Sequence, residues 1–253
     1  MNKIQNIILS IFMMFAINAC AKGNIKVPAN YLDQETKYAV VAISCWSKIE
    51  VEVGPSGGGV LPYLVKEAAT SKGRDSLAEK LSRAMGDWKP EEILRDRIYE
   101  YLSNHGRMAA NIEGSVPIPS DIVGDLEEED AWGSISLGWY NPDKSVFDHS
   151  QIIDEYKVDV IIETGYARYS IQNKGGKQTL NINCLIKVVR TNDGEVIGRR
   201  IGYLFGGSKG RGVIGEFDLD DESQIIPFVT KFKAVFDDEL RIMVKECMEK
   251  LGL

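Results

Sequence analysis

A serine in a glycine-rich segment is the first residue of this chain whose surroundings could support catalysis. Gly54-Pro-Ser56-Gly-Gly58 satisfies the pattern Gly-x-Ser-x-Gly, in which a serine hydroxyl stands exposed on a sharp turn between a strand and a helix. Such a hydroxyl needs a histidine as its general base, and the chain contains only His105 and His149. His105 lies at the predicted end of a helix, where a cation favours the helix dipole. This leaves His149 as the other candidate base. A serine hydrolase that uses Ser56 is the alternative to the protein-binding function considered at the end of this section.

A second glycine-rich segment carries positive charge. Gly206 to Gly212 contains Lys209 and Arg211, and these two cations could bind an anion or a carboxylate of a partner protein. The competing interpretation is an ordinary mobile loop, because clustered glycines mark turns and loops wherever they occur.

Three acidic residues near the C-terminal third of the chain could bind calcium. Asp218, Asp220 and Glu222 offer hard oxygen ligands, but Ser223 and Val229 stand where an EF-hand loop has its glycine and its last glutamate. Carboxylates also favour the positive end of a helix dipole, which explains these acids without a metal. We predict no cofactor and no metal, with calcium as the alternative.

Cys20 ends a segment typical of a signal peptide. Lys3 supplies the positive charge, Ile7 to Ile17 an apolar run, and small Ala19 precedes the cysteine. The run is shorter than the roughly 20 apolar residues that cross a bilayer, which favours cleavage over retention. The pattern Ile17 to Cys20 resembles the lipobox of bacterial lipoproteins. That resemblance implies acylation of Cys20, with palmitate for example, whereas an ordinary signal peptide with a nearby cysteine is the alternative.

The charge balance bears on partners and location. Loss of residues 1–19 removes only Lys3 and takes the formal net charge from −7 to −8. An acidic chain without a basic stripe argues against nucleic acid as a partner, and against adhesion to anionic lipids through protein charge. The lipid on Cys20 would then anchor the protein to the membrane. Ala21 is not the aspartate associated in some bacteria with inner-membrane retention, which favours the periplasmic face of the outer membrane.

Three more cysteines follow Cys20. Cys45, Cys184 and Cys247 are far apart and lack the C-x-x-C spacing of zinc ribbons and thioredoxin-like sites. They can be three buried thiols, or one pair can form a disulfide in an oxidising compartment. Their spacing in the sequence does not distinguish three free thiols from one disulfide and one free thiol.

The rest of the pattern predicts one α/β domain with a mixed sheet flanked by helices. We expect the signal peptide over residues 1–19, a tether over 20–37 that reaches at most about 60 Å, and a single domain over 38–253. Prolines and an acidic run predict an irregular insertion near 114–150. The expected elements are strands at 38–43, 49–53, 108–112 and 158–171, a helix at 87–104, a helical turn at 152–156, a hairpin over 180–205 and a C-terminal helix on the sheet.

This order of elements resembles the small α/β domain of curli-secretion lipoproteins, penicillin-binding-protein activator lipoproteins and the N-terminal domain of the Tol translocation protein. The resemblance rests on Tyr38 to Ile43, Ile93 to Leu102 with Gly106, Val158 to Glu163, and Cys184 to Val196. It implies a protein that binds other envelope proteins rather than a catalyst. We therefore expect a lipid-anchored binding or assembly factor whose partners are envelope proteins, with self-association also open.

Overall fold

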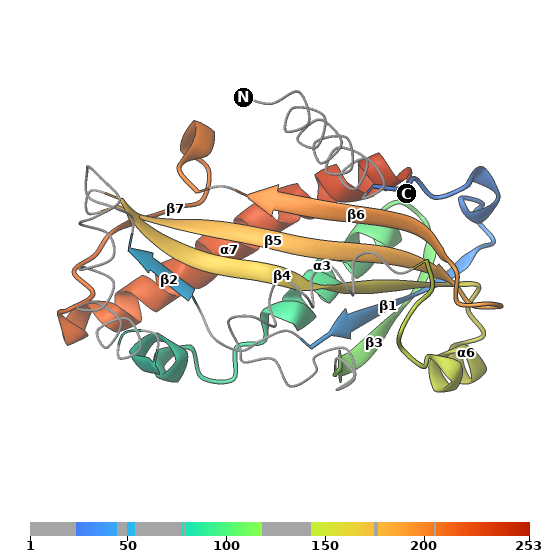
Figure 1. Cartoon of the computed structure of the whole chain (residues 1–253), viewed down its shortest axis with the longest axis horizontal. Coiled ribbons are helices and arrows are strands. Elements are labelled where there is room, and N and C mark those ends of the chain that lie inside the picture. Colours follow the sequence, from blue (N-terminus) through green and yellow to red (C-terminus); the bar gives the residue numbers. More distant parts are fainter. Residues whose placement is uncertain are drawn as a thin grey trace, which may run out of the picture.

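The computed structural model describes residues 24–44, 50–53, 77, 79–117, 143–174, 177–204 and 206–253. Within these residues, seven strands form one mixed sheet (Figure 1). Five of the strands run in the order β3-β1-β4-β5-β6, while β2 pairs with β4 and β7 pairs with β5. The strands are β1 (Lys37–Ile43), β2 (Glu50–Val53), β3 (Met108–Val116), β4 (Val160–Lys174), β5 (Lys177–Arg190), β6 (Val196–Leu204) and β7 (Val213–Glu216).

The two longest strands form the centre of the sheet. β4 and β5 pair antiparallel from Val160↔Arg190 to Lys174↔Lys177, with one irregularity in the register. β1 and β2 lie one after the other along the outer edge of β4, and both are parallel to it. The opposite edge of β5 is shared in the same way by β6 and β7. β3 completes the sheet by pairing parallel with β1.

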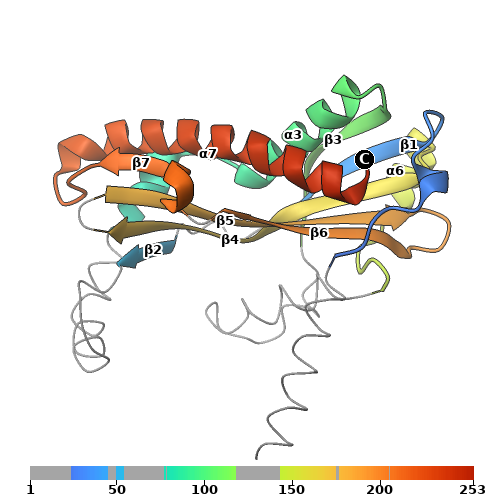
Figure 2. The same ribbon diagram turned by 90° about the horizontal axis from the view of Figure 1, so that it is seen from above.

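Helices α3 (Pro90–Asn104) and α7 (Glu222–Leu251) lie on one face of the sheet (Figure 2). Pro90 begins α3, where its missing N–H costs no intrahelical hydrogen bond. Asp221 caps the N-terminus of α7, and Gly252 ends that helix at a positive φ of 89°. The apolar stripe of α7 packs on the sheet with Trp88, whose ring centroid lies 4.9 Å from that of Phe236.

The other face of the sheet has its own, smaller core. Residues of β1 alternate between the two cores, since Val40 belongs to the first and Val41 to the second. The short helix α6 (Ser150–Tyr156) contributes partly buried isoleucines to this side. The buried members of the second core are Ala39, Val41, Ile43, Phe147, Val158, Ile161, Leu185, Val189 and Val196.

The expected fold class and the C-terminal helix on the sheet are confirmed. β3 is longer than the predicted strand at 108–112 and takes up the beginning of the expected insertion, and β7 was not predicted. β7 has only four residues, one of them Gly215, so its sequence carries little strand signal. Among the described residues, no helix is both long and apolar enough to serve as a membrane span.

Candidate functional site

Three charged side chains form a row across the second face of the sheet. Glu163 on β4 is the register partner of Lys187 on β5, and Lys187 is the register partner of Arg199 on β6. Glu163 and Lys187 are fully buried and Arg199 is 4% exposed. We call these three residues the ionic row. Buried charges are costly unless they are paired, so this row is the most demanding polar feature of the described chain.

The carboxylate of Glu163 contacts Lys187 of the row and two polar side chains from outside it. Its Oε2 lies 3.8 Å from Lys187 Nζ. Its Oε1 accepts a hydrogen bond from the Ser145 hydroxyl and lies 2.8 Å from His149 Nε2. Ser145 and His149 precede α6, and the N–H of Phe147 donates to Ser145 Oγ at 3.1 Å. The segment before α6 therefore supplies two polar side chains to one carboxylate on the sheet.

Burial changes the protonation of Lys187. Removal of its ammonium group from water is the largest cause and lowers the pKa of Lys187 to about 8. The negative charge of Glu163 partly offsets this effect, while the positive charge of Arg199 adds to it. Lys187 consequently loses its positive charge at a pH closer to neutral than an exposed lysine does.

The contacts of Ser145 decide what this group can do chemically. In the Ser-His-Asp triad a histidine nitrogen takes the proton of the serine, and the acid holds the far side of the imidazole. Here the hydroxyl of Ser145 and the ring of His149 both contact Glu163 Oε1. The arrangement therefore differs from that triad, because the hydroxyl of Ser145 bonds to the carboxylate itself.

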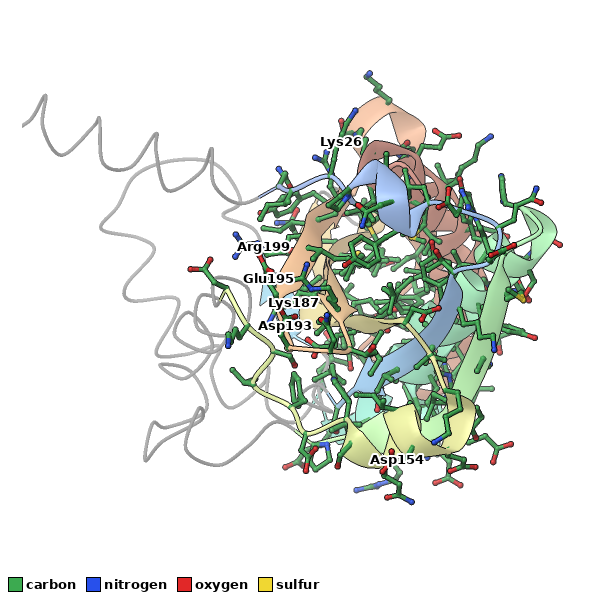
Figure 3. The ribbon with its side chains drawn as sticks, turned by 90° about the vertical axis from the view of Figure 1, so that its right-hand side faces the viewer. Lys26, Asp154, Lys187, Asp193, Glu195 and Arg199 are labelled. Carbon is green, nitrogen blue, oxygen red and sulfur yellow. The ribbon has the colours of Figure 1, made fainter. Side chains whose placement is uncertain are left out.

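The edge of the sheet next to the row is occupied by the N-terminal segment. The N–H of Ile25 donates to Arg199 O, and the N–H of Arg199 donates to Ile25 O, both at 2.9 Å. Val27 is buried and its N–H donates to Leu251 O at 3.0 Å. We call residues 24–36 the N-terminal strap. Figure 3 looks onto this end of the molecule and labels Lys26 of the strap with Lys187 and Arg199.

The strap is held at further points along its length. Its short 3-10 helix spans Ala29–Tyr31, and Tyr31 O accepts a hydrogen bond from the hydroxyl of Tyr38. Arg190 Nη1 donates to the hydroxyl of Tyr31 at 3.3 Å, and Arg107 donates to Leu32 O. These contacts tie the strap to β1, to β5 and to the turn between α3 and β3.

The predicted tether over residues 20–37 must be corrected from Asn24 onward. Val27 and Thr36 are buried, and Ile25 adds a bridge to β6, so this part of the chain belongs to the domain. Only four steps of chain separate Cys20 from Asn24. At ~3.3–3.6 Å per step they reach about 14 Å, instead of the 60 Å or so of a free tether. The polar composition of the segment concealed this packing, because backbone pairing at a sheet edge needs few apolar side chains.

The cations of the second glycine-rich segment do not form a common site. Arg211 Nε lies 2.8 Å from Glu239 Oε2, and Glu239 Oε1 accepts the N–H of Gly212 at 2.6 Å. A second carboxylate of α7, that of Glu246, lies 3.4 Å from Arg211 Nη1. Lys209 is exposed and has a positive φ of 53°. Arg211 thus fastens the loop to α7, and its charge is already engaged within the chain.

The acidic residues before α7 have the contacts of a helix N-terminus. Asp221 Oδ1 accepts hydrogen bonds from the hydroxyl of Ser223 at 2.8 Å and from its N–H at 2.9 Å, and both lower the pKa of Asp221. Asp218 Oδ1 accepts the N–H of Asp220 at 3.1 Å, and Glu222 lies 3.4 Å from Lys80 Nζ. In the part of the chain that the structure describes, no three His, Cys, Asp or Glu residues are arranged to hold a metal. The calcium alternative therefore finds no geometric support at Asp218, Asp220 and Glu222.

The remaining predicted site residues are Cys20 and Ser56, and both lie outside the described residues, as does Cys45. The two histidines that could serve Ser56 are described. His105 Nδ1 lies 2.7 Å from Tyr101 O, and its ring stacks on that of Tyr101 at the end of α3. His149 contacts Glu163. The hydrolase hypothesis thus remains a prediction that needs its own test.

Sequence reasoning missed the ionic row. Its signal was present, because Glu163, Lys187 and Arg199 interrupt strands that are otherwise apolar or alternating. A charged residue in a strand normally indicates a solvent-exposed face. Only the register between β4, β5 and β6 shows that the three positions lie side by side on a buried face.

No known protein family and no curated protein matches this chain. Similar solved structures include a protein of Xanthomonas campestris, 10% identical, with a TM-score of 0.39 and coverage of 87% of each chain. A PelC dodecamer of Paraburkholderia phytofirmans is 11% identical, with a TM-score of 0.32, over 84% of this chain and 96% of that chain. A lipoprotein of Neisseria meningitidis is 11% identical, with a TM-score of 0.29, over 79% and 98%. TM-scores this low carry no argument about function.

Proposed function

We propose that this protein is a lipid-anchored lipoprotein of the bacterial cell envelope that acts as a binding or assembly factor. The lipobox pattern ending at Cys20 supports the anchor, and an outer-membrane position facing the periplasm is favoured by Ala21. The partners are other envelope proteins, with a second copy of the chain as a further candidate. Catalysis is not part of the proposal.

The observation that carries the proposal is the pairing of Ile25 with Arg199. A lipid on Cys20 would hold this edge of the sheet within about 18 Å of the bilayer surface, because only five steps of chain separate Cys20 from Ile25. A domain held so closely has little freedom to search the periplasm. It is suited to partners that lie in the membrane or directly beside it.

The strap also gives the domain an orientation. Ile25 pairs with β6, and Val27 pairs with the last turn of α7 at Leu251. The edge strand β6 and the C-terminal end of α7 would therefore be on the membrane side. The N-terminal end of α7 and the segment β7 lie at the far end of the long hairpin (Figure 1) and would be the most distant from the lipid.

The test is crosslinking of the tagged, full-length protein in intact cells of its own bacterium, followed by mass spectrometry of the envelope proteins that co-purify. Cys20→Ala is the unanchored control. A specific partner that disappears in this control supports the proposal. Crosslinks that are the same with and without the anchor would contradict it.

Two variants test the short distance to the membrane. A flexible Gly-Ser insertion of about twelve residues after Ala21 keeps the lipid but lets the domain move away from the bilayer. Ile25→Pro removes the N–H that donates to Arg199 O, and Lys26→Ala is its control because Lys26 is exposed. We expect weaker crosslinks for the insertion and for Ile25→Pro, and unchanged crosslinks for Lys26→Ala. Ser56→Ala in the same assay should leave the binding function intact, whereas a hydrolase using Ser56 would lose its activity.

A further inference from the structure

Two cysteines that are far apart in the chain meet beneath one glycine. Cys184 lies on β5 and Cys247 on α7, and Gly202 on β6 is the register partner of Cys184. A Cβ atom placed on Gly202 would lie 2.7 Å from Cys184 Sγ and 2.9 Å from Cys247 Sγ. The two sulfur atoms thus surround the same small space. Gly202 leaves this space open, because any larger residue would collide with both thiols.

The thiols interact directly with each other. Cys184 is fully buried and Cys247 is 3% exposed. The neighbouring Cys184 thiol lowers the pKa of Cys247, burial opposes this effect, and the charges of Arg200 and Lys250 lower the pKa further. The Cys184 thiol also donates to Met243 Sδ at 3.9 Å. The same contact with Cys247, together with burial, raises the pKa of Cys184. Cys247 is therefore the better nucleophile of the two, and it is also the one nearer to solvent.

We propose that Cys184 and Cys247 are a disulfide-forming pair that links β5 to α7 when the chain folds in an oxidising compartment. This inference rests on the proposed envelope location for its occurrence in cells, but the pairing itself is a property of the fold. The oxidant belongs to the class of thiol–disulfide exchange reagents, which are disulfide-bearing proteins or small disulfides.

The exchange proceeds in two balanced steps. The thiolate of Cys247 attacks one sulfur of the external disulfide, so that a mixed disulfide forms and one external thiolate leaves. The thiolate of Cys184 then attacks Cys247 Sγ, the protein disulfide forms, and the second external thiolate leaves. The two protein thiols lose two protons and two electrons, and the external disulfide gains them as two thiols.

The bond would tie two separate parts of the fold together. β5 is a central strand, and α7 covers one face of the sheet. Cys184 and Cys247 enclose more than sixty residues of chain, which include β6 and β7. A disulfide that closes a loop of this length lowers the conformational entropy of the unfolded chain. We therefore expect the oxidised protein to melt roughly 10 °C above the reduced one.

The first experiment uses the full-length protein purified in detergent, carrying Cys20→Ala and Cys45→Ser so that Cys184 and Cys247 are the only thiols left. The protein is unfolded and reduced, then refolded in mixtures of reduced and oxidised glutathione. Non-reducing peptide mapping should recover one disulfide joining the peptides of Cys184 and Cys247, with a mass lower by two hydrogens. Cys184→Ala and Cys247→Ala are the controls, and each should refold without that linked peptide.

The outcome of this refolding decides the pairing. If circular dichroism shows a folded protein while Cys184 and Cys247 stay free at every glutathione ratio, the inference is overturned. The same conclusion follows if each thiol carries only bound glutathione. A linked peptide whose formation raises the melting temperature supports it.

A second experiment separates this inference from the proposed location. Cells of the native bacterium are quenched with acid and their free thiols are alkylated, for the full-length protein and for a version lacking residues 1–19. Oxidation of the pair in the full-length protein alone supports both the disulfide and the envelope location. If the purified protein forms the bond but both cellular forms stay reduced, the disulfide pair stands as a property of the fold and the envelope location is contradicted.

Discussion

The two faces of the central sheet bury side chains of different chemistry. Under α3 and α7 a large apolar core surrounds Phe236, and the buried charges Glu91, Arg95 and Glu239 lie on the helices, while the opposite face buries Glu163 beside Lys187 on the sheet itself, within a smaller apolar core. Truncation of a buried apolar side chain lowers the free energy of unfolding, because its contacts are lost and a cavity remains. When a buried charge loses its partner, the free-energy cost of removing that charge from water is no longer offset. The two faces should therefore respond differently to substitution and to pH.

The largest effect is expected on the face covered by helices. Phe236→Ala should lower the free energy of unfolding by about 4 kcal/mol, because the ring is fully buried and packs against Trp88 and Tyr169. Ile242→Ala is the control on the same helix, since Ile242 is 46% exposed, and should cost under about 0.5 kcal/mol. Urea unfolding monitored by tryptophan fluorescence measures both. Equal losses for the two variants would contradict the packing described here.

The ionic row should be the next most sensitive place. Glu163→Gln leaves the Lys187 cation without its carboxylate and should cost about 3 kcal/mol. Glu216→Gln is the matched control, because Glu216 pairs with Lys177 at 3.5 Å on the surface of the same sheet, and it should cost at most about 1 kcal/mol. Adding Lys187→Met to Glu163→Gln should recover part of the loss. If the double variant is less stable than Glu163→Gln, the charges do not compensate each other as proposed.

The pH dependence of stability gives a sharper test of the same row. The pKa of Lys187 is lowered from its ordinary 10.5 to about 8, so between these values the unfolded chain binds more protons than the folded protein. This residue should therefore make the protein more stable as pH rises from 8 to 10.5, by roughly 3 kcal/mol in all, with no contribution to the slope below or above that window. Lys187→Met should remove this slope, and Lys177→Met, on the same strand but exposed, should keep it. Urea titrations across this pH range measure the difference.

The smallest effect is expected at the start of α7. Asp221→Ala removes the side chain that accepts the N–H of Ser223 and should cost about 1 kcal/mol. Asp220→Ala changes the residue just before the cap and should cost much less. Hydrogen exchange of the first turn of α7 would localise the effect. A similar loss of protection in both variants would argue for a general charge effect instead of a cap.

The local patterns of the chain predicted most of the elements, for clear reasons. Helix α3 begins at a proline and has apolar residues at helical spacing, and β5 alternates with period two. The turn before β6 contains Gly194 at a positive φ of 72°, as a hairpin of this composition requires. These signals depend on neighbouring residues only. β7 is too short to carry such a signal, and it forms because β5 extends beyond β6 and leaves an unpaired edge.

The candidate sites were less predictable than the elements. Lys209 and Arg211 are candidates because they are cations among glycines, but the structure engages Arg211 with α7. Asp218, Asp220 and Glu222 lie at a helix N-terminus, as the interpretation without a metal expects. The charge of a side chain indicates which groups it can bind. In the folded chain, a neighbouring group such as the Glu239 carboxylate can already occupy that side chain. Cys20 and Ser56 depend on a processing pattern and a turn pattern, and both stay predictions.

The sequence by itself determined the fold class, the order of the main elements and the acidic net charge of the chain, because these follow from composition and from the spacing of near neighbours. Only the tertiary structure decided which distant residues meet. It aligned Glu163, Lys187 and Arg199 on one buried row, joined Ile25 to the edge of β6, and brought Cys184 and Cys247 together beneath Gly202. Strand register and helix packing set these contacts. Both depend on the burial of whole faces, which no single segment encodes.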